Sequence, residues 1–401
     1  MANLPIVHVI NGRQKKILQG HPWVYGNEIE RVEGEPADGG LVQAVDYRGR
    51  YLGAGFYNSR SLITVRLLTH RGEDVTDALV AQRVRQAVAY RDQCMCREGT
   101  DCRRLIFGEA DRLPGVICDQ FAGVVVLQIL ALGMERWTQV IADTLVQCVP
   151  TMETLLLKND DAIRLKEGMT CFTKVLHGPE RAKTVVHENG IALRVDLLGG
   201  QKTGYFLDQK ANHLFLRRFV RNRRVLDCFT YIGGFALNAA AAGASGASGA
   251  AGVTAVDISP EACALARENA ALNGLPVDVV CENCFDFLRE QVRQKARYDV
   301  VVLDPPAFTK AKANLANACR GYKEIALSAM RLLGPGGVLA THSCSYHMPE
   351  ETFVHTVLSA AQDLHRQARV ITLRRQDIDH PVLAGYPESH YLKSLWLQML
   401  D

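Results

Sequence analysis

Three carboxylates and one thiol follow short apolar runs in the C-terminal half of the sequence. Asp227 ends RVLD, Asp257 ends VTAVD, Asp304 ends YDVVVLD and Cys344 ends GGVLATHSC. If each run is a strand of one parallel sheet, the four side chains lie along its carboxyl edge, where α/β proteins bind ligands. Carboxylates at that edge can bind the hydroxyl and amino groups of a cofactor, and a thiol can act as a covalent nucleophile. The pattern indicates an active site.

The stretch Arg224–Phe235, RVLDCFTYIGGF, predicts a strand, a tight turn and the start of a helix. Gly233 and Gly234 let the backbone approach a ligand closely, and Asp227 can accept hydrogen bonds from a positively charged or amine-bearing cofactor. Asp257 follows about twenty-five residues later, where a nucleotide-binding fold places a carboxylate on ribose hydroxyls. We therefore expect a nucleoside-cofactor site.

Asp304 is followed by Pro305, Pro306 and Phe308. The prolines fix an extended exit from the strand, Asp304 can hydrogen-bond a base edge, and Phe308 can stack on the base. Because adjacent strands lie about 5 Å apart, Cys344 should face the same pocket. Its polar neighbours predict a lowered pKa and a reactive thiolate.

The length of 401 residues is too great for one ordinary domain. Alternating segments and Gly-rich turns predict a small β domain over residues 1–72. An amphipathic helix and further strands predict an α+β domain over 73–188, and repeated βα units predict a parallel, doubly wound sheet over 189–401. The last apolar run, YLKSLWLQML, is expected to be an antiparallel strand at the edge of that sheet.

Bulk composition limits the partners. The net charge of +3 makes RNA binding depend on local patches. The absence of a long apolar run and of a signal-peptide pattern favours a cytoplasmic location without membrane contact. The twelve cysteines are expected to be free thiols, and no metal site is predicted.

Basic and aromatic residues mix in the N-terminal domain, and they either bind RNA or form core and solvated rim; both readings stay open. In the central domain, three acidic residues near a Pro–Gly turn are expected to serve local hydrogen bonding. The two groups are Arg13, Lys15, Lys16, Trp23, Tyr25, Phe56, Tyr57, Arg60 and Arg66, and Glu109, Asp111 and Asp119.

The motifs TGYFLDQK (Thr203–Lys210), LDCFTYIGGF, VDIS, DPPAF and HSCS occur in this order behind a small β domain. Together they resemble the class I S-adenosylmethionine-dependent methyltransferases that make 5-methylcytosine in large-subunit (23S) ribosomal RNA and carry a PUA domain in front. The resemblance continues through ACRGYKEI and DHPVLAGYPESHYLK, so it spans essentially the whole chain. It implies a Rossmann-like methyltransferase domain preceded by a PUA-like β-barrel and a central α+β domain.

The resemblance also implies the ligands and the roles of residues. The cofactor is S-adenosylmethionine, and the partner is 23S rRNA, free or in an assembling large subunit; the oligomeric state is open, with a homodimer among the alternatives. Asp304 meets the cytosine ring beside the cofactor, and Cys344 is the nucleophile. Tyr205, Phe206, Asp208 and Gln209 border the cofactor, Asp227, Phe229 and Gly233 hold its methionine end, Asp257 binds the ribose, and Glu282 or Asn283 meets the adenine.

Three other functions fit parts of this pattern. An Asp-Pro-Pro-aromatic motif also occurs in enzymes that methylate exocyclic amines of adenine or guanine, which need no cysteine. A non-catalytic RNA-binding factor could retain a degenerate methyltransferase domain, although intact Asp227, Gly233, Asp257 and Asp304 argue against it. An NAD-dependent dehydrogenase is disfavoured because the turn lacks the G-x-G-x-x-G spacing.

Overall fold

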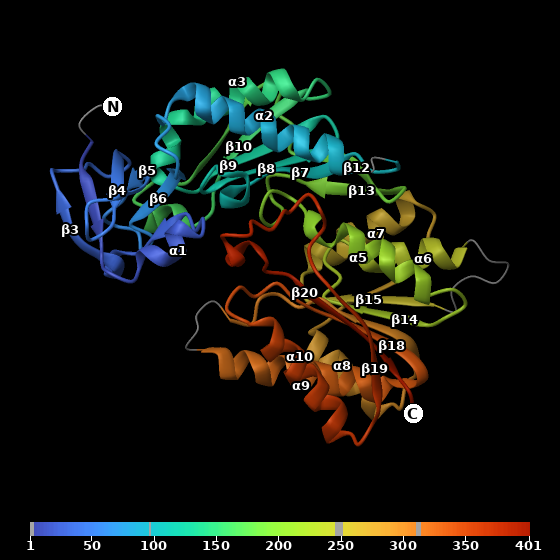
Figure 1. Ribbon diagram of the computed structural model, residues 1–401. Coiled ribbons are helices and arrows are strands. Elements are labelled where there is room, and N and C mark those ends of the chain that lie inside the picture. The colour runs from blue at the N-terminus through green and yellow to red at the C-terminus, as the bar shows by residue number, and fades with distance from the viewer. Residues whose placement is uncertain (1–3, 96–97, 245–251, 310–313) are drawn as a thin grey trace.

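A computed structural model describes residues 4–95, 98–244, 252–309 and 314–401. Its strands form four sheets. Figure 1 shows the N-terminal and central parts side by side above the C-terminal sheet. No helix in these ranges is long and apolar enough to cross a membrane.

The N-terminal part is a six-stranded sheet in the order β2-β6-β5-β4-β1-β3. It encloses a small core around Val7, Val42 and Val65. Phe56 is 1% exposed and belongs to the core of the next domain instead, so the two parts pack directly together. The elements are β1 Ile6–Val9, α1 Gln14–Leu18, β2 Trp23–Val24, β3 Ile29–Glu33, β4 Leu41–Val45, β5 Tyr51–Tyr57 and β6 Val65–Thr69.

The central part is a five-stranded sheet in the order β11-β10-β9-β8-β7, with α2 and α3 packed on one face. Thr76 caps α2 by accepting a hydrogen bond from the Leu79 amide, as expected for a helix that begins after a Thr. The hairpin β12–β13 joins this part to the C-terminal domain through a shared apolar core. The elements are α2 Asp77–Cys94, β7 Cys102–Phe107, β8 Val116–Phe121, β9 Val124–Ile129, α3 Thr138–Cys148, β10 Thr154–Asn159, α4 Ile163–Lys166, β11 Phe172–His177, β12 Lys183–Glu188 and β13 Ile191–Asp196.

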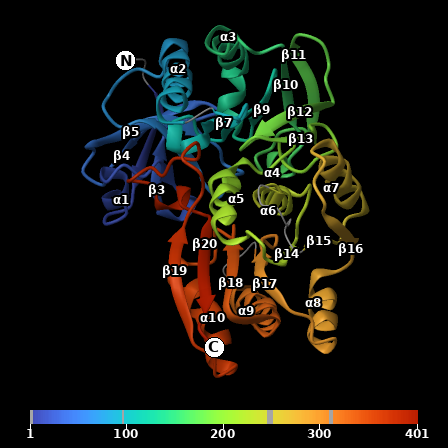
Figure 2. The same ribbon diagram turned by 90° about the vertical axis from the view of Figure 1, so that its right-hand side faces the viewer.

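The C-terminal part is a seven-stranded sheet in the order β16-β15-β14-β17-β18-β20-β19. The first five of these strands are parallel, and helices cover both faces, with α5, α6 and α7 on one side and α8, α9 and α10 on the other (Figure 2). The elements are α5 Lys210–Leu216, β14 Val225–Cys228, α6 Gly234–Ala244, β15 Val253–Asp257, α7 Pro260–Leu272, β16 Asp278–Cys281, α8 Cys284–Arg293, β17 Tyr298–Leu303, α9 Leu315–Leu332, β18 Leu333–Ser343, α10 Glu350–Asp363, β19 Ala368–Arg374 and β20 Lys393–Met399.

One predicted strand position is wrong. The last strand, β20, is antiparallel as expected, but it lies between β18 and β19 rather than at the edge. Its burial explains this, since six of its seven residues are buried, whereas β19 alternates between half-buried and exposed positions. A strand buried on both faces belongs inside a sheet.

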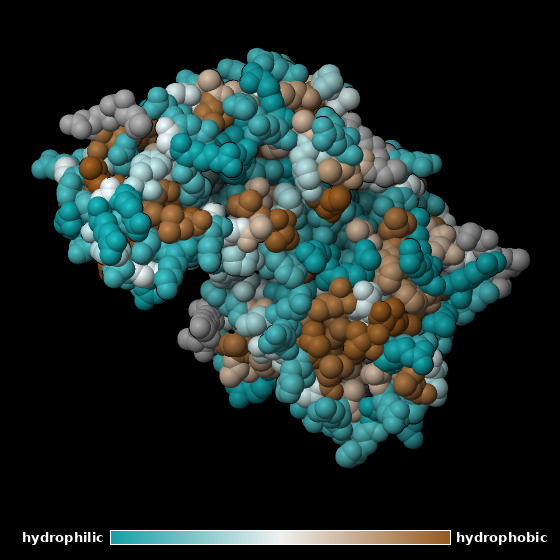
Figure 3. Space-filling model, in the orientation of Figure 1, coloured by the Kyte–Doolittle hydropathy of each residue, from teal (hydrophilic) through white to brown (hydrophobic). Residues whose placement is uncertain are grey.

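The apolar area in Figure 3 lies where β19 and α5 run in Figure 1. Exposed apolar side chains on these elements include Leu214 at 49% and Val370 at 49%. Large exposed apolar patches often mark contact surfaces. The homodimer nevertheless stays a prediction, because a single chain shows no partner.

A segment between β19 and β20, residues 375–392, joins all three parts; we call it the joining segment. Its Asp379 carboxylate accepts hydrogen bonds from the Arg104 amide in β7 and from Lys210 Nζ in α5. Its Glu388 pairs with His21 of the N-terminal domain at 3.2 Å. The joining segment therefore fixes the N-terminal and central domains against the sheet that carries the candidate site.

Candidate active site

The ends of four neighbouring strands meet at one edge of the C-terminal sheet. The register pairs Asp227 of β14 with Val302 of β17, and Leu303 of β17 with Thr341 of β18. The Asp304 amide continues this ladder by donating to the Cys228 carbonyl at 3.3 Å. The structure thus places Asp227, Asp304 and Cys344 on consecutive strands at the same edge.

Asp227 is fully buried and only partly hydrogen-bonded. Its Oδ2 accepts from Thr230 Oγ1 at 2.6 Å and from the Ala236 amide at 3.0 Å, whereas its Oδ1 has no partner. Burial raises the pKa of Asp227 to about 7. A buried acceptor left open is costly, so the arrangement fits a ligand that brings an ammonium group to Oδ1.

The turn after β14 is held in an unusual conformation. Phe229 and Tyr231 have positive φ angles of 66° and 51°, and Gly233 has a φ of +97°. A Cβ atom on Gly234 would lie 2.7 Å from the His213 ring and 2.8 Å from the Tyr205 hydroxyl. Strained turns of this kind concentrate at ligand sites, and here the glycines let the chain pass closely.

Asp257 ends β15, and each of its carboxylate oxygens accepts a hydrogen bond from a backbone amide. Oδ1 accepts from the Ser259 amide at 3.0 Å and Oδ2 from the Tyr231 amide at 2.9 Å. The neighbouring Ile258 is 64% exposed, which makes an apolar surface beside the carboxylate. A carboxylate next to an apolar surface suits a nucleoside, whose ribose is polar and whose base is flat and apolar on its face.

Glu282 and Asn283 are the two residues expected near the adenine, and they differ in whether a side-chain oxygen is free to accept a hydrogen bond. Asn283 caps α8, because its Oδ1 accepts from the Phe285 amide at 2.9 Å. Glu282 is exposed beside it. The carboxylate of Glu282 is therefore the better placed acceptor for an adenine amino group, which sharpens an alternative that the sequence leaves open.

The segment from Tyr205 to Gln209 runs along the same edge. Gln209 Nε2 donates to Asp304 Oδ1 at 3.0 Å, and Tyr391 of the joining segment donates to Asp208 Oδ2 at 2.5 Å. Asp208 Oδ1 is buried without a partner, and Phe206 meets the Tyr231 ring edge-on at 5.4 Å. Two predicted site residues, Gln209 and Asp208, thus act directly on Asp304, while Phe206 lies against the turn after β14.

Cys344 is half-buried among charged side chains, but these do not lower the pKa of its thiol as the sequence predicts. Burial, with the carboxylates of Asp304 and Asp208 adding to it, raises the pKa of Cys344 to about 12. The predicted lowering of the thiol pKa is wrong for the chain without ligands, because burial and the two carboxylates, Asp304 after β17 and Asp208 before α5, disfavour the thiolate. Burial and Asp208 likewise raise the pKa of Asp304 to about 7.

The residues after Asp304 have separate environments. Pro305 is buried and Pro306 is exposed. The Phe308 ring packs 4.6 Å from the Tyr322 ring and would touch a Cβ on Gly321 at 3.0 Å. Phe308 therefore braces the loop against α9, and base stacking by it, like substrate contact by the prolines, stays a prediction.

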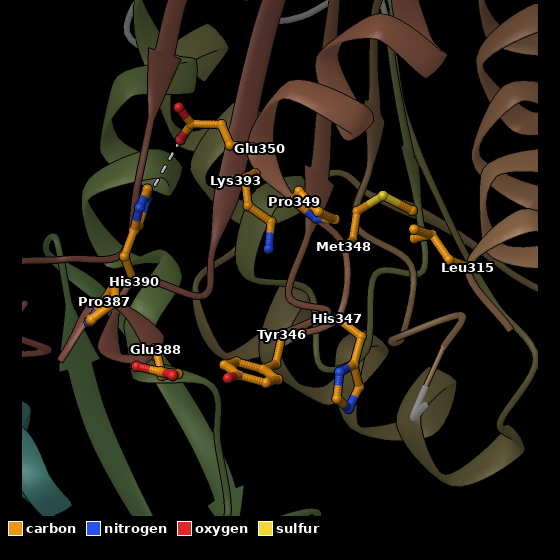
Figure 4. Close-up of a pocket in the computed structure, with 10 residues that line it drawn as sticks. All are labelled: Leu315, Tyr346, His347, Met348, Pro349, Glu350, Pro387, Glu388, His390 and Lys393. Carbon is orange, nitrogen blue, oxygen red and sulfur yellow. Dashed lines mark ion pairs between the residues drawn. The ribbon is translucent and has the colours of Figure 1, made fainter. Parts of the chain in front are cut away.

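Tyr391, Lys393 and Ile258 are residues near the site that reasoning from the sequence did not select. Lys393 lines a pocket of about 340 Å³ together with His390 and with Tyr346 and His347 of the segment that follows Cys344 (Figure 4). Ile258 lies in the VDIS motif, and Tyr391 and Lys393 lie in DHPVLAGYPESHYLK, so the motifs mark their segments. The contacts that bring these side chains to the site come from distant parts of the chain, which no motif specifies.

The sequence predicts local hydrogen bonding for Glu109, Asp111 and Asp119. Asp111 does accept a local hydrogen bond, from the Phe107 amide at 2.6 Å, but Glu109 and Asp119 bond residues of other domains. Glu109 accepts from Trp23 Nε1 at 2.8 Å and from Arg66 at 2.9 Å, and both partners lie in the N-terminal domain. Asp119 accepts from Thr203 Oγ1 of the C-terminal domain at 2.6 Å. These carboxylates connect domains, and they remove Trp23 and Arg66 from the set available to RNA.

In the part of the chain that the structure describes, no three His, Cys, Asp or Glu side chains are grouped as metal ligands. The open carboxylate oxygens, the thiol and the strained turn at this edge of the sheet fit a cationic nucleoside cofactor beside a flat substrate.

Two family models match the chain. A PUA-like domain matches residues 7–70, and an S-adenosylmethionine-dependent methyltransferase matches residues 160–373. A structure described as a SAM-dependent methyltransferase from Streptococcus mutans covers 98% of this chain and 99% of its own with a TM-score of 0.83 at 20% identity, which shows the shared fold. The chain is thus an S-adenosylmethionine-dependent methyltransferase with a PUA-like domain in front.

Curated relatives narrow the family. "Ribosomal RNA large subunit methyltransferase I" of Salmonella arizonae is 39% identical over 396 residues, covering 98% of this chain and 96% of the relative. The protein of the same name from Aeromonas salmonicida is 39% identical over 394 residues, with 97% and 98% covered. The chain belongs to the ribosomal RNA large subunit methyltransferase I family.

Proposed function

We propose that this protein makes 5-methylcytosine in 23S ribosomal RNA in the cytoplasm, through a covalent bond between Cys344 and C6 of the target cytosine. The observation that carries the proposal is the position of Cys344 at the end of β18, one strand from Asp304 at the end of β17. A thiol and a carboxyl group at neighbouring strand ends can hold opposite sides of one pyrimidine. The relatives' name supports large-subunit rRNA as the substrate.

Cytosine C5 is a weak nucleophile, and Cys344 overcomes this. The thiolate forms a bond to C6, and the electron pair of the C5=C6 bond moves to C5. S-adenosylmethionine, when bound, supplies an electrophilic methyl group to that carbon. The C5 proton then leaves to a base, the C5=C6 bond forms again, and the electron pair of the S–C6 bond returns to Cys344.

Asp304 is suited to hold the ring during addition. With its pKa raised to about 7, it carries a proton part of the time at neutral pH. A protonated carboxyl group can donate to N3 of cytosine and accept from the exocyclic amine. That pair of hydrogen bonds favours the charge that develops on the ring when sulfur adds. Gln209, which donates to the other face of the carboxyl group, keeps it oriented.

The residues expected to bind the cofactor follow neighbouring strands at one edge of the sheet. We propose that Asp227, Phe229 and Gly233 bind the methionine end, Asp257 the ribose and Glu282 the adenine. The cofactor is bordered on the side of Asp304 by Tyr205, Phe206, Asp208 and Gln209. The open Oδ1 atom of Asp227 is the specific support, because the methionine end carries an ammonium group.

The base must leave the RNA structure to reach Cys344, since it cannot be attacked within a stack. Figure 3 shows a hollow between the N-terminal domain and the side of the C-terminal domain that carries α9 and α10. Arg13 and Lys15 are exposed on and before α1 at this side of the N-terminal domain. We propose that RNA lies across this hollow with its phosphates on these cations.

Replacing Cys344 tests the proposal. Purified protein, a 23S rRNA transcript and labelled S-adenosylmethionine are incubated, and the RNA is digested to nucleosides. We expect wild-type protein and the control Cys171→Ala, an exposed cysteine in the central domain, to form 5-methylcytosine, and Cys344→Ala to form none. Full methyl transfer by Cys344→Ala would establish an exocyclic-amine methyltransferase, and N-methylated adenine or guanine would identify it. A protein that binds RNA but not S-adenosylmethionine would be a non-catalytic factor.

A further inference from the structure

Lys393 is a buried cation next to the proposed nucleophile. It is the first residue of β20 and only 3% exposed. The antiparallel register pairs it with Ser343, and its Nζ donates to the Ser345 carbonyl at 2.7 Å. Its contacts therefore fall on the residues immediately before and after Cys344.

This ammonium group has no carboxylate of its own. Among the residues that the structure describes, no Asp or Glu oxygen lies within 4.0 Å of Lys393 Nζ. The nearest candidate, Glu350 in α10, pairs with His390 at 3.6 Å instead (Figure 4). Figure 4 shows the Lys393 side chain directed into the pocket between His390 and Pro349. A buried cation without an anion is costly, so its retention points to an anion that forms during the reaction.

We propose that Lys393 is a positioning residue that stabilises the thiolate of Cys344 by its positive charge. The inference rests on the proposed function, because it assigns a partner to the same nucleophile. Cys344 is half-buried, so the thiol proton leaves to solvent, and the electron pair stays on sulfur within electrostatic reach of the ammonium group. The positive charge of Lys393 lowers the pKa of Cys344, whereas Asp304 and Asp208 both oppose its ionisation.

The groups around this pair are spread over several elements. Asp304 follows β17, Asp208 precedes α5, and Tyr322 in α9 and Tyr391 in the joining segment also lie within electrostatic reach of the thiol. Glu350 and His390 lie near the amine. Burial lowers the pKa of Lys393 to about 8, against the opposing effects of Cys344 and Glu350. The amine is thus charged at pH 7 and neutral above about pH 9.

That titration gives a test that needs neither RNA nor methyl transfer. The full-length protein is treated with iodoacetamide between pH 6.5 and 10, and alkylation of the Cys344 peptide is followed by mass spectrometry. The exposed Cys281 in the same molecule serves as the internal control. We expect Lys393→Met to slow alkylation of Cys344 about tenfold at pH 7, since a neighbouring charge shifts a thiol pKa by about one unit or more.

The pH dependence separates a charge effect from a packing effect. The difference between wild type and Lys393→Met should vanish near pH 10, where the wild-type amine is neutral. Lys393→Arg, which stays charged, should keep the faster alkylation up to pH 10. Cys281 should react at the same rate in all three proteins. If Lys393→Met is poorly folded, the comparison of Lys393→Arg with wild type above pH 9 is sufficient by itself.

The inference is overturned if alkylation of Cys344 is the same in Lys393→Met and wild type across the pH range. If Lys393→Met then also binds RNA more weakly and with a shallower salt dependence, Lys393 is a phosphate contact instead. Neither outcome depends on whether cytosine C5 is the methylated atom, which the Cys344→Ala experiment decides separately.

Discussion

Two regions of this molecule bury charge, and they treat it in opposite ways. At the joining segment, Asp379 is fully buried with Lys210, His380 and the Arg104 amide on its oxygens. Burial would raise its pKa, but Lys210 and His380 outweigh burial and hold the pKa of Asp379 well below its ordinary value. At the strand edge, Asp304 has one amide donor, and burial raises its pKa to about 7.

The difference separates structure from function. A buried carboxylate that is fully paired holds domains together and is ionised at every physiological pH. At the strand edge, Asp227 is buried with one open oxygen, which is unfavourable in the free protein until a donor reaches it. The active site therefore carries a cost in stability that the paired network at the domain junction offsets.

Asp379→Asn should have the largest effect on stability. It leaves the buried Lys210 with only Asp377, at 3.3 Å, and removing one partner of a buried ion pair costs about 3–5 kcal/mol. Urea unfolding at pH 7 measures the loss. The deficit should shrink as the pH falls below about 3.9, the ordinary pKa of an unfolded aspartate, because the unfolded wild type then takes up a proton that the paired native carboxylate does not. The exposed Glu324→Gln, at the pair with Arg289, should leave the midpoint unchanged; an equal loss there would remove the contrast.

Asp227→Asn should have the next largest effect, on cofactor binding. Removing a charged acceptor from the ammonium group of S-adenosylmethionine costs about 1.5–3 kcal/mol, which is roughly a 10- to 100-fold rise in Kd. Calorimetric titration measures it. Thr230→Val, which removes the hydroxyl donor to Asp227 but keeps the carboxylate, should weaken binding less. Equal affinity of Asp227→Asn and wild type would contradict the assigned position of the methionine end.

Asp304→Asn should raise stability while Asp379→Asn lowers it. Between the unfolded pKa of about 3.9 and the folded pKa, the native state binds more protons than the unfolded state, so stability falls as pH rises. Asparagine avoids that loss, and we expect a gain of about 1–2 kcal/mol at pH 8 that disappears at pH 4. Thermal unfolding at both pH values tests the sign. If Asp304→Asn is less stable than wild type at pH 8, the charges of Asp304 and Asp379 do not have opposite effects on stability.

Surface cations should have the smallest effect. Arg13→Ala and Lys15→Ala remove exposed charges near α1 and should each weaken RNA binding a few-fold, with the slope of log K against log salt falling by about 0.7–0.9 per cation. S-adenosylmethionine binding should not change. Arg221→Ala, an exposed cation in the C-terminal domain, is the matched control, and an equal loss with it would locate the RNA elsewhere.

Much of the C-terminal domain could be read from the sequence because its elements are specified locally. The apolar run YDVVVL becomes β17, and Ser259 before Pro260 starts α7 with a side-chain cap and a proline in the first turn. Parallel strands then bring their carboxyl ends together by geometry alone. The candidate residues Asp227, Asp304 and Cys344 follow from that rule.

Features that depend on distant partners could not be read in this way. Nothing local distinguishes Glu109, which bonds Trp23 and Arg66, from an ordinary turn carboxylate. The place of β20 inside the sheet depends on which strands leave room for it. The high pKa of Cys344 depends on burial and on carboxylates from other segments.

By itself, the sequence determined which side chains stand at the ends of strands, because hydrophobic periodicity and turn residues act over a few positions. Only the tertiary structure decided which of those side chains are paired, since pairing depends on groups brought from far along the chain. Asp379 and Asp304 are the same residue type, yet Lys210 pairs with Asp379 and keeps its pKa low, whereas Asp304 has a raised pKa. Burial disfavours the charge of each carboxylate, and the neighbours in the folded chain decide whether a cation compensates for it.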